Sequence, residues 1–227
     1  MKKNHAYDIF PARHRPEVMG RWDGAAWHRV PTLRIANFRV ESSSHRPWTT
    51  VKLLHSSDGL HGLFMVRDRY IRCIRNRFQD QVYKDSCVEF FAQPKPGRGY
   101  FNFEFNCGGT MLATYIVNPT RVKSGFKDFT PLSLEDARQV QIFHSLPEVI
   151  DPEIPDETLW FVEFCIPYTL FEKYVGPTAP VAGQTWRANF YKCADESSHP
   201  HWAVWAPVDE MNFHLPRCFG HLHFLKQ

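Results

Sequence analysis

The 227-residue chain lacks an apolar run of the length that crosses a bilayer, and it has no long block of like charge. The first twenty residues carry lysines but no apolar segment behind them, so they are not a secretory signal peptide as written. We therefore expect a cytoplasmic protein, or an extracytoplasmic one whose leader has been removed. The net charge is only +3, with basic and acidic residues interspersed, and neither a nucleic acid nor a membrane is expected as a partner.

The sequence also lacks internal repeats, heptads, low-complexity tracts and C-x-x-C pairs. Its six cysteines are far apart, and four of them fall in strand-like stretches. A thiol in such a stretch behaves as a small buried hydrophobe, so we expect these cysteines to be buried rather than to form a disulfide framework.

Aromatic residues are abundant, at 15% of the chain, and bulky rings favour pleated sheets. Alternating stretches separated by turn residues predict about ten strands, with one or two short helices near 130–138 and after Pro167. The sequence thus predicts an all-β protein: a two-sheet antiparallel β-sandwich, jelly-roll or immunoglobulin-like. We expect residues 31–227 to form this single domain. Residues 1–30 should form an irregular extension packed on it through "GRWDGAAW" (20–27).

Polar residues occupy one face of several predicted strands. In "YFNFEFNC" (100–107), the phenylalanines point one way, while Asn102, Glu104 and Asn106 point the other way. Residues 184–193 repeat the pattern, with Arg187 and Asn189 on the face opposite the core. In "VYKDSCVEFFAQP" (82–94), Glu89 shares its face with a cysteine and a phenylalanine.

Carboxylate, amide and guanidinium groups beside aromatic rings suit a ligand rich in hydroxyl groups, such as a sugar. The competing interpretation is a structural polar network, for example Glu163 paired with Arg187, since buried polar groups need partners in any case. Glu89 would then meet either sugar hydroxyls or an arginine such as Arg187. A one-residue slip in the hairpin between 88–93 and 100–106 would move Glu89 to the other face.

The succession "DSCVEFFAQP", "YFNFEFNCGG", "LWFVEFCIP", "GQTWRANFYKC" and "FHLPRCFGHLHF" resembles the family 9 carbohydrate-binding modules over about residues 20–225. The resemblance implies a jelly-roll-like sandwich without catalytic activity. It further implies a mono- or oligosaccharide as the ligand and a polysaccharide-degrading enzyme as a partner. No cofactor is expected; some members bind structural calcium, but no D-x-D-x-D loop is present to place it.

By the same resemblance, Glu89 matches the binding glutamate, and Glu104 and Asn106 match polar binding positions on the next strand. Two aromatic side chains clamp the sugar in the sugar-binding members, and Tyr83 and Phe213 fall at or near those positions. Both are smaller rings than the tryptophans found there, and they offer less stacking area. The predicted binding residues are Tyr83, Glu89, Glu104, Asn106, Arg187, Asn189 and Phe213.

Three other functions remain open from the sequence. A glycosidase would use two of Glu89, Glu104 and Glu163 across one cleft. A metal site would draw on scattered side chains that match no known ligand spacing: His144, His199, His201, His214, Cys218, His221 and His223. An interaction module would present the aromatic residues of "HPHWAVWAP" and "MNFHLP" to a protein partner.

Overall fold

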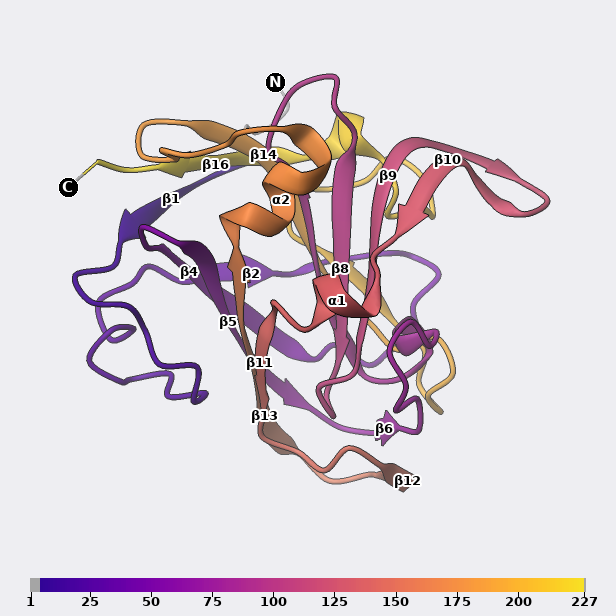
Figure 1. Cartoon of the computed structure of the whole chain (residues 1–227). Coiled ribbons are helices and arrows are strands. Elements are labelled where there is room, and N and C mark those ends of the chain that lie inside the picture. The colour runs from indigo at the N-terminus through magenta and orange to yellow at the C-terminus, as the bar shows by residue number, and fades with distance from the viewer. Residues whose placement is uncertain (1–4, 227) are drawn as a thin grey trace.

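The computed structural model describes residues 5–226, and the chain is all-β, as predicted. Most strands join one large sheet that curls around the core (Figure 1). One half of it, here called sheet A, has the order β10 (Gly125–Pro131), β9 (Met111–Val122), β8 (Tyr100–Asn106), β7 (Cys87–Gln93), β14 (Thr185–Cys193), β16 (Gly220–Phe224) and β1 (Ala6–Pro11). The other half, sheet B, continues from β1 through β4 (Trp48–His55), β5 (Gly59–Asp68), β13 (Thr158–Pro167) and β11 (Gln141–His144).

Strand β1 joins the two halves and corrects the predicted layout. Tyr7 pairs with Leu222 of β16, and Phe10 pairs with Leu54 of β4; both pairings are parallel. The sheet is therefore mixed rather than two separate antiparallel sheets. The segment 1–30, expected to be irregular, supplies this strand, and its residues 1–4 lie outside the described part.

Short elements complete the fold. Strand β2 (Leu33–Ile35) pairs with β4, β3 (Asn37–Phe38) with β15 (Trp202–Val204), and β6 (Ile71–Cys73) with β12 (Ile150–Ile154). The helices are α1 (Leu134–Ala137) and α2 (Tyr168–Val175), with single 3₁₀ turns η1 (Val82–Lys84) and η2 (Pro216–Cys218). Ser133 is the N-cap of helix α1, and its side chain accepts a hydrogen bond from the Asp136 amide. Within residues 5–226, no helix has the length and apolar character that a membrane crossing requires.

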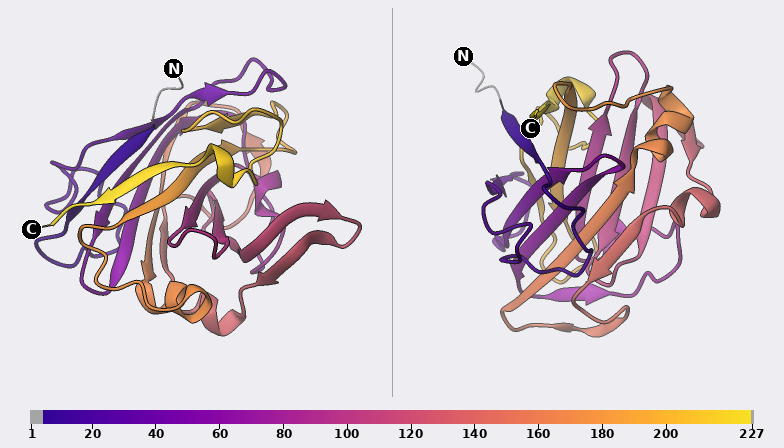
Figure 2. Two further views of the ribbon diagram at one scale, coloured as in Figure 1. Left: turned by 90° about the horizontal axis from the view of Figure 1, so that it is seen from above. Right: turned by 60° about the vertical axis from the view of Figure 1, so that its left-hand side comes forward.

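Alternation places the core between the two halves of the sheet, which Figure 2 shows as facing layers. Phe90 of β7 and Phe105 of β8 stack on Phe164 of β13, with ring centroids 5.7 and 5.3 Å apart. Phe190 of β14 meets Phe64 of β5 edge-on at 6.2 Å. Burial of such large rings provides most of the driving force for folding. The residues between them along each strand must point away from this core, and the outside of sheet A is therefore set by the same alternation.

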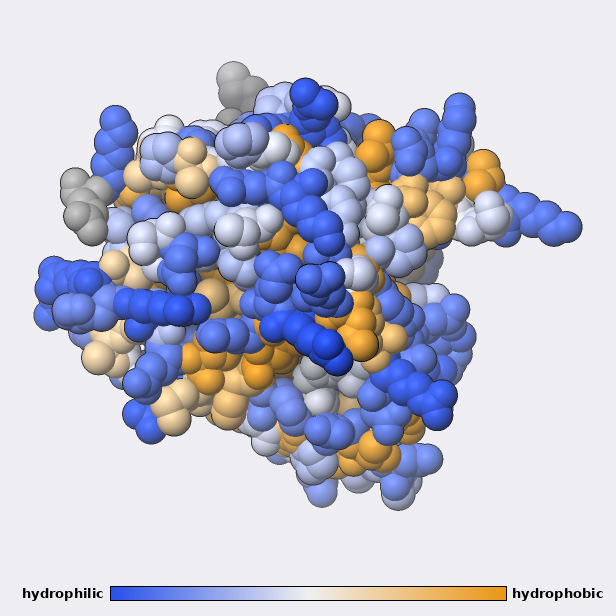
Figure 3. Space-filling view, viewed as in Figure 1, coloured by the Kyte–Doolittle hydropathy of each residue, from blue (hydrophilic) through white to orange (hydrophobic). Residues whose placement is uncertain are grey.

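The exterior is mixed. On the side shown in Figure 3, apolar patches alternate with hydrophilic side chains. The hairpin of β9 and β10 extends beyond the body of the molecule (Figures 1 and 2), and it carries exposed Val117 and Val122.

Candidate functional site

The register of three neighbouring strands brings the predicted polar residues together on the outer face of sheet A. Glu89 of β7 lies directly opposite Glu104 of β8 on one side and Tyr191 of β14 on the other. Side chains directly opposite in an antiparallel pair have Cβ atoms about 4.5–5.5 Å apart. The two carboxyl groups therefore share one small area, here called the Glu89–Glu104 face.

Glu89 meets a thiol rather than an arginine. Its Oε1 atom accepts a hydrogen bond from the Cys193 Sγ atom at 3.1 Å, and the side chain is 2% exposed. Burial raises the pKa of Glu89 well above its usual value, and the nearby Cys193 and Glu104 raise it further. The Glu89 carboxyl group is consequently held in an environment that favours its neutral form.

Glu104 is buried with an incomplete set of partners. Asn102 Nδ2 donates a hydrogen bond to Glu104 Oε1 at 2.7 Å, whereas Glu104 Oε2 and Asn102 Oδ1 are both buried without a hydrogen-bond partner. Burial raises the pKa of Glu104 to about 8, and the Asn102 hydrogen bond opposes that rise. Leaving buried polar atoms unpaired costs roughly 1–3 kcal/mol each, so two such atoms side by side call for an explanation.

Aromatic side chains border this face. Tyr83, from η1, and Phe213, from the loop before η2, are both half-buried and pack against the same buried group of Val82, Cys87 and Cys193. Phe213 stacks on Tyr191 with ring centroids 4.2 Å apart and an interplanar angle of 16°. The Tyr191 hydroxyl donates to the Phe213 carbonyl at 2.9 Å, which fixes that loop to the sheet.

Three other predicted site residues are engaged with the backbone. Asn106 donates to the Arg75 carbonyl and accepts from the Thr110 amide in the β8–β9 turn. Arg187 donates from Nη2 to the Phe219 carbonyl at 2.6 Å.

Asn189 donates to the Ala206 carbonyl and accepts from the Ala206 amide, both at 2.9 Å, in the manner of a neighbouring strand. Each of these contacts holds a loop or turn in place.

Glu163 lies on the other half of the sheet, and its carboxyl group is fully partnered. Oε2 accepts from the Met19 and Gly20 amides at 2.9 and 2.6 Å, and Oε1 accepts from Trp27 Nε1 at 3.0 Å. Lys52 donates to the Trp22 and Trp27 carbonyls beside it. These contacts hold residues 19–27 against sheet B, and Glu163 accepts them rather than pairing with Arg187.

The histidines considered as metal ligands do not gather at one place. His221 and His223 are neighbours, with ring centroids 6.3 Å apart, but no third ligand atom of the described residues joins them. His201 contacts Lys192 in a buried network with Asp68, His214 meets the Tyr100 hydroxyl, and His144 meets the Leu146 carbonyl. Across residues 5–226, the only group of three or more close His, Cys, Asp or Glu ligand atoms is Cys87, Glu89 and Cys193.

Two hollows lie elsewhere on the molecule. A pocket of about 500 Å³ is lined by His55, Tyr168 and Pro180 among others, and one of about 280 Å³ by Phe78, Met111 and Ile142 among others. Neither includes Glu89 or Glu104. Buried polar atoms without a partner occur elsewhere too, the Tyr168 hydroxyl beside the first pocket among them. The Glu89–Glu104 face is marked by the combination of two neighbouring unpaired acceptors with bordering aromatic rings, rather than by cavity volume.

Two contributors to this face were not among the predicted site residues. Asn102 stands two positions before Glu104 on the same strand, so the period of two that selected Glu104 also identifies it. Cys193 gave no such signal, because a lone cysteine in a strand is usually a core residue. Only the pairing of β14 with β7 places it against Glu89.

The sequence and the fold were compared with those of known proteins. The profile of the family described as "Carbohydrate-binding family 9" matches residues 25–224. A search of curated proteins found no match.

Among the solved structures that match, three are similar over nearly the whole chain. A "putative carbohydrate-binding protein" from Bacteroides uniformis has a TM-score of 0.84 at 24% identity, covering 98% of this chain and 100% of that one. A family 9 module from Caldicellulosiruptor kristjanssonii in complex with cellotriose has a TM-score of 0.66 at 15% identity, covering 98% and 95%. Its complex with glucose has a TM-score of 0.62 at 14% identity, covering 97% and 96%. At these identities the structures establish a shared fold.

Proposed function

The chain belongs to carbohydrate-binding family 9, a family of non-catalytic modules, and on this premise we propose that it binds a mono- or oligosaccharide at the Glu89–Glu104 face. The similar structures with bound glucose and cellotriose make those sugars the first ligands to test. In line with the resemblance, we propose that the domain accompanies a polysaccharide-degrading enzyme.

The observation that carries the proposal is the pair of buried, unpartnered acceptors, Glu104 Oε2 and Asn102 Oδ1. Each lacks a donor from the protein, and sugar hydroxyl groups are donors. Both atoms are enclosed in this structure, so a ligand hydroxyl would reach them only after bordering side chains move, and it would then remove the cost of leaving them unpaired. A Glu104 carboxyl group that is neutral can also donate a hydrogen bond to a hydroxyl or ring oxygen.

The bordering rings support the same ligand class. Tyr83 and Phe213 flank the buried thiols beside Glu89, and their half-buried rings could stack on the C–H faces of a pyranose. Tyr191 backs Phe213 from one side, which reduces the entropy that this ring would lose on binding. Asn106, Arg187 and Asn189 bond the backbone of the turn and loops around the face, and in this proposal they do not contact the sugar.

A glycosidase finds less support. Glu163, one of its three candidate carboxyl groups, binds the N-terminal segment on sheet B, and the family is non-catalytic. An interaction module would need exposed aromatic residues, but Trp205 of "HPHWAVWAP" is buried and Trp202 donates from Nε1 to Asp195 at 2.7 Å.

The proposal is tested by calorimetric titration of glucose, cellotriose and a panel of other saccharides. We expect binding in the millimolar range or tighter, weakened at least about tenfold in Tyr83→Ala and in Phe213→Ala, since loss of a stacking ring costs about 1–3 kcal/mol. Trp48→Ala removes a half-exposed aromatic side chain from sheet B and is the matched control. Absence of binding across the panel, or equal losses in the control, would contradict the proposal.

A further inference from the structure

Cys87, Glu89 and Cys193 form a compact set of ligand atoms that saccharide binding does not explain. Cys87 and Cys193 lie directly opposite each other on β7 and β14, and Glu89 is two residues along β7 on the same face. The two Sγ atoms and a Glu89 oxygen lie within 4.8 Å of one another, and Cys193 Sγ is 3.1 Å from Glu89 Oε1. Neither cysteine is in a disulfide.

From this geometry we propose that Cys87, Glu89 and Cys193 bind a divalent cation of the zinc class. A tetrahedral Zn²⁺ has Zn–S bonds of about 2.3 Å and Zn–O bonds of about 2.0–2.2 Å, so its ligand atoms stand about 3.5–3.8 Å apart. The three atoms need only small side-chain adjustments to reach that arrangement. Two hydrogen-bonded strands hold the three Cα positions, which limits the entropy lost on binding.

The donor set selects the class of ion. Thiolates are soft ligands that favour zinc and similar ions over Ca²⁺ and Mg²⁺, which prefer oxygen. Three protein ligands leave a fourth tetrahedral position for water or another donor. The site is therefore distinct from the calcium considered from the family resemblance.

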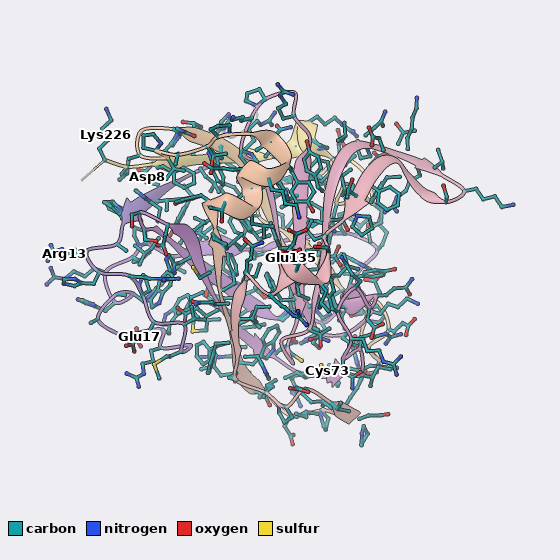
Figure 4. All side chains as sticks on the ribbon, in the orientation of Figure 1. Asp8, Arg13, Glu17, Cys73, Glu135 and Lys226 are labelled. Atoms are coloured by element: carbon teal, nitrogen blue, oxygen red, sulfur yellow. The ribbon has the colours of Figure 1, made fainter. Side chains whose placement is uncertain are left out.

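The other cysteines do not form such a set. Cys73, labelled in Figure 4, lies on β6 and donates to the Glu148 carbonyl, while Cys165 on sheet B lies 3.8 Å from a ring nitrogen of His61. Cys87 and Cys193, by contrast, both lie close to the Glu89 carboxyl group, and the half-buried Tyr83 and Phe213 border them. Displacement of these rings offers a route by which an ion enters.

Binding requires that the thiols release their protons. Burial raises the pKa of Cys87 to about 12 and that of Cys193 well above its usual value. The ion must compete with those protons, so its apparent affinity should increase as pH rises.

The test is a titration of the metal-free, reduced full chain with Co²⁺, followed by displacement with Zn²⁺. No saccharide is present, so failure here is separable from failure of saccharide binding. We expect one equivalent of Co²⁺ to give the visible bands of a tetrahedral complex and a thiolate-to-cobalt band in the near ultraviolet, and Zn²⁺ to abolish both.

Variants assign the ligands. Cys193→Ser should weaken Co²⁺ binding at least 100-fold, and the near-isosteric Glu89→Gln, the variant less disruptive to folding, at least tenfold. Cys218→Ser, which removes a half-buried thiol outside the cluster, should leave the titration unchanged. Absence of the thiolate band, its persistence in Cys193→Ser, or its loss in Cys218→Ser would overturn the proposal.

Discussion

The tripeptide Val-Glu-Phe occurs on both halves of the sheet, at 88–90 on β7 and at 162–164 on β13, with opposite outcomes for the glutamate. Both glutamates point away from the core, and both are almost fully buried, at 2% and 0% exposure. Glu163 receives three hydrogen bonds from the N-terminal segment. Glu89 receives one from a thiol, and its neighbour Glu104 retains an unpartnered oxygen.

The difference lies in what covers each face. Sheet B is covered by the N-terminal segment, which supplies backbone and indole donors to Glu163. The Glu163 carboxyl group is therefore structural. Sheet A is bordered at the corresponding place by aromatic rings, which supply no such donors to Glu104. A buried carboxyl group therefore indicates function when its environment lacks donors, and indicates anchoring when distant chain segments provide them.

The largest loss of stability should come from removing the Glu163 carboxyl group, whose oxygens are both hydrogen-bonded. Glu163→Ala leaves two backbone amides and the Trp27 indole without an acceptor, so we expect a loss of about 3–5 kcal/mol in the free energy of unfolding. Urea denaturation measures it. Glu157→Ala, at an exposed position on the same half of the molecule, should change stability by less than about 0.5 kcal/mol. A loss below about 1 kcal/mol for Glu163→Ala would show that the donors are not essential to the anchor.

The pH dependence of stability should distinguish sheet A. The pKa of Glu104 is raised in the folded state to about 8, so the folded protein retains a proton that the unfolded chain releases near pH 4.5. The contribution of this group is complete below pH 4.5 and is lost by about 1.4 kcal/mol per pH unit as pH rises towards 8. Glu104→Gln cannot ionise, so it should gain stability over the natural protein across this interval.

Urea denaturation of both proteins at several pH values measures that difference. Glu157→Gln serves as the exposed control, and its difference from the natural protein should stay nearly constant. A constant difference for Glu104→Gln between pH 5 and pH 8 would mean that Glu104 is ionised in the folded protein.

A smaller loss of stability is expected when the side-chain amide of Asn189 on sheet A, which has its partners within the protein, is removed. Asn189→Ala removes two hydrogen bonds to Ala206 and should cost about 1–3 kcal/mol in the free energy of unfolding. The saccharide affinity of the folded fraction should stay unchanged, because Asn189 has its partners within the protein. Denaturation and calorimetry on the same preparation separate the two, and a loss of affinity at full stability would place Asn189 among the ligand contacts.

Much of this comparison could be predicted from alternation. The strand 100–106 has phenylalanines in the core and Asn102 and Glu104 outside, as its pattern requires. The partner of Glu163 could not be predicted, since Met19 and Trp27 are more than 130 residues away in the sequence and the pattern contains no long-range pairing. The parallel strand β1 was missed because its six residues, beside a Pro- and Arg-rich stretch, give little local signal. Its pairing with β16 and β4 is also long-range, and the pattern does not contain it.

The most direct test of the account is calorimetric titration of cellotriose and glucose into the natural protein and into Glu104→Ala. We expect saccharide binding by the natural protein and at least a tenfold loss in Glu104→Ala, about 1.4 kcal/mol, because the ligand would lose its contact with the unpartnered acceptor. Glu157→Ala should bind like the natural protein. Equal affinity of Glu104→Ala and the natural protein would contradict the claim that the unpartnered carboxyl oxygen on sheet A receives the sugar.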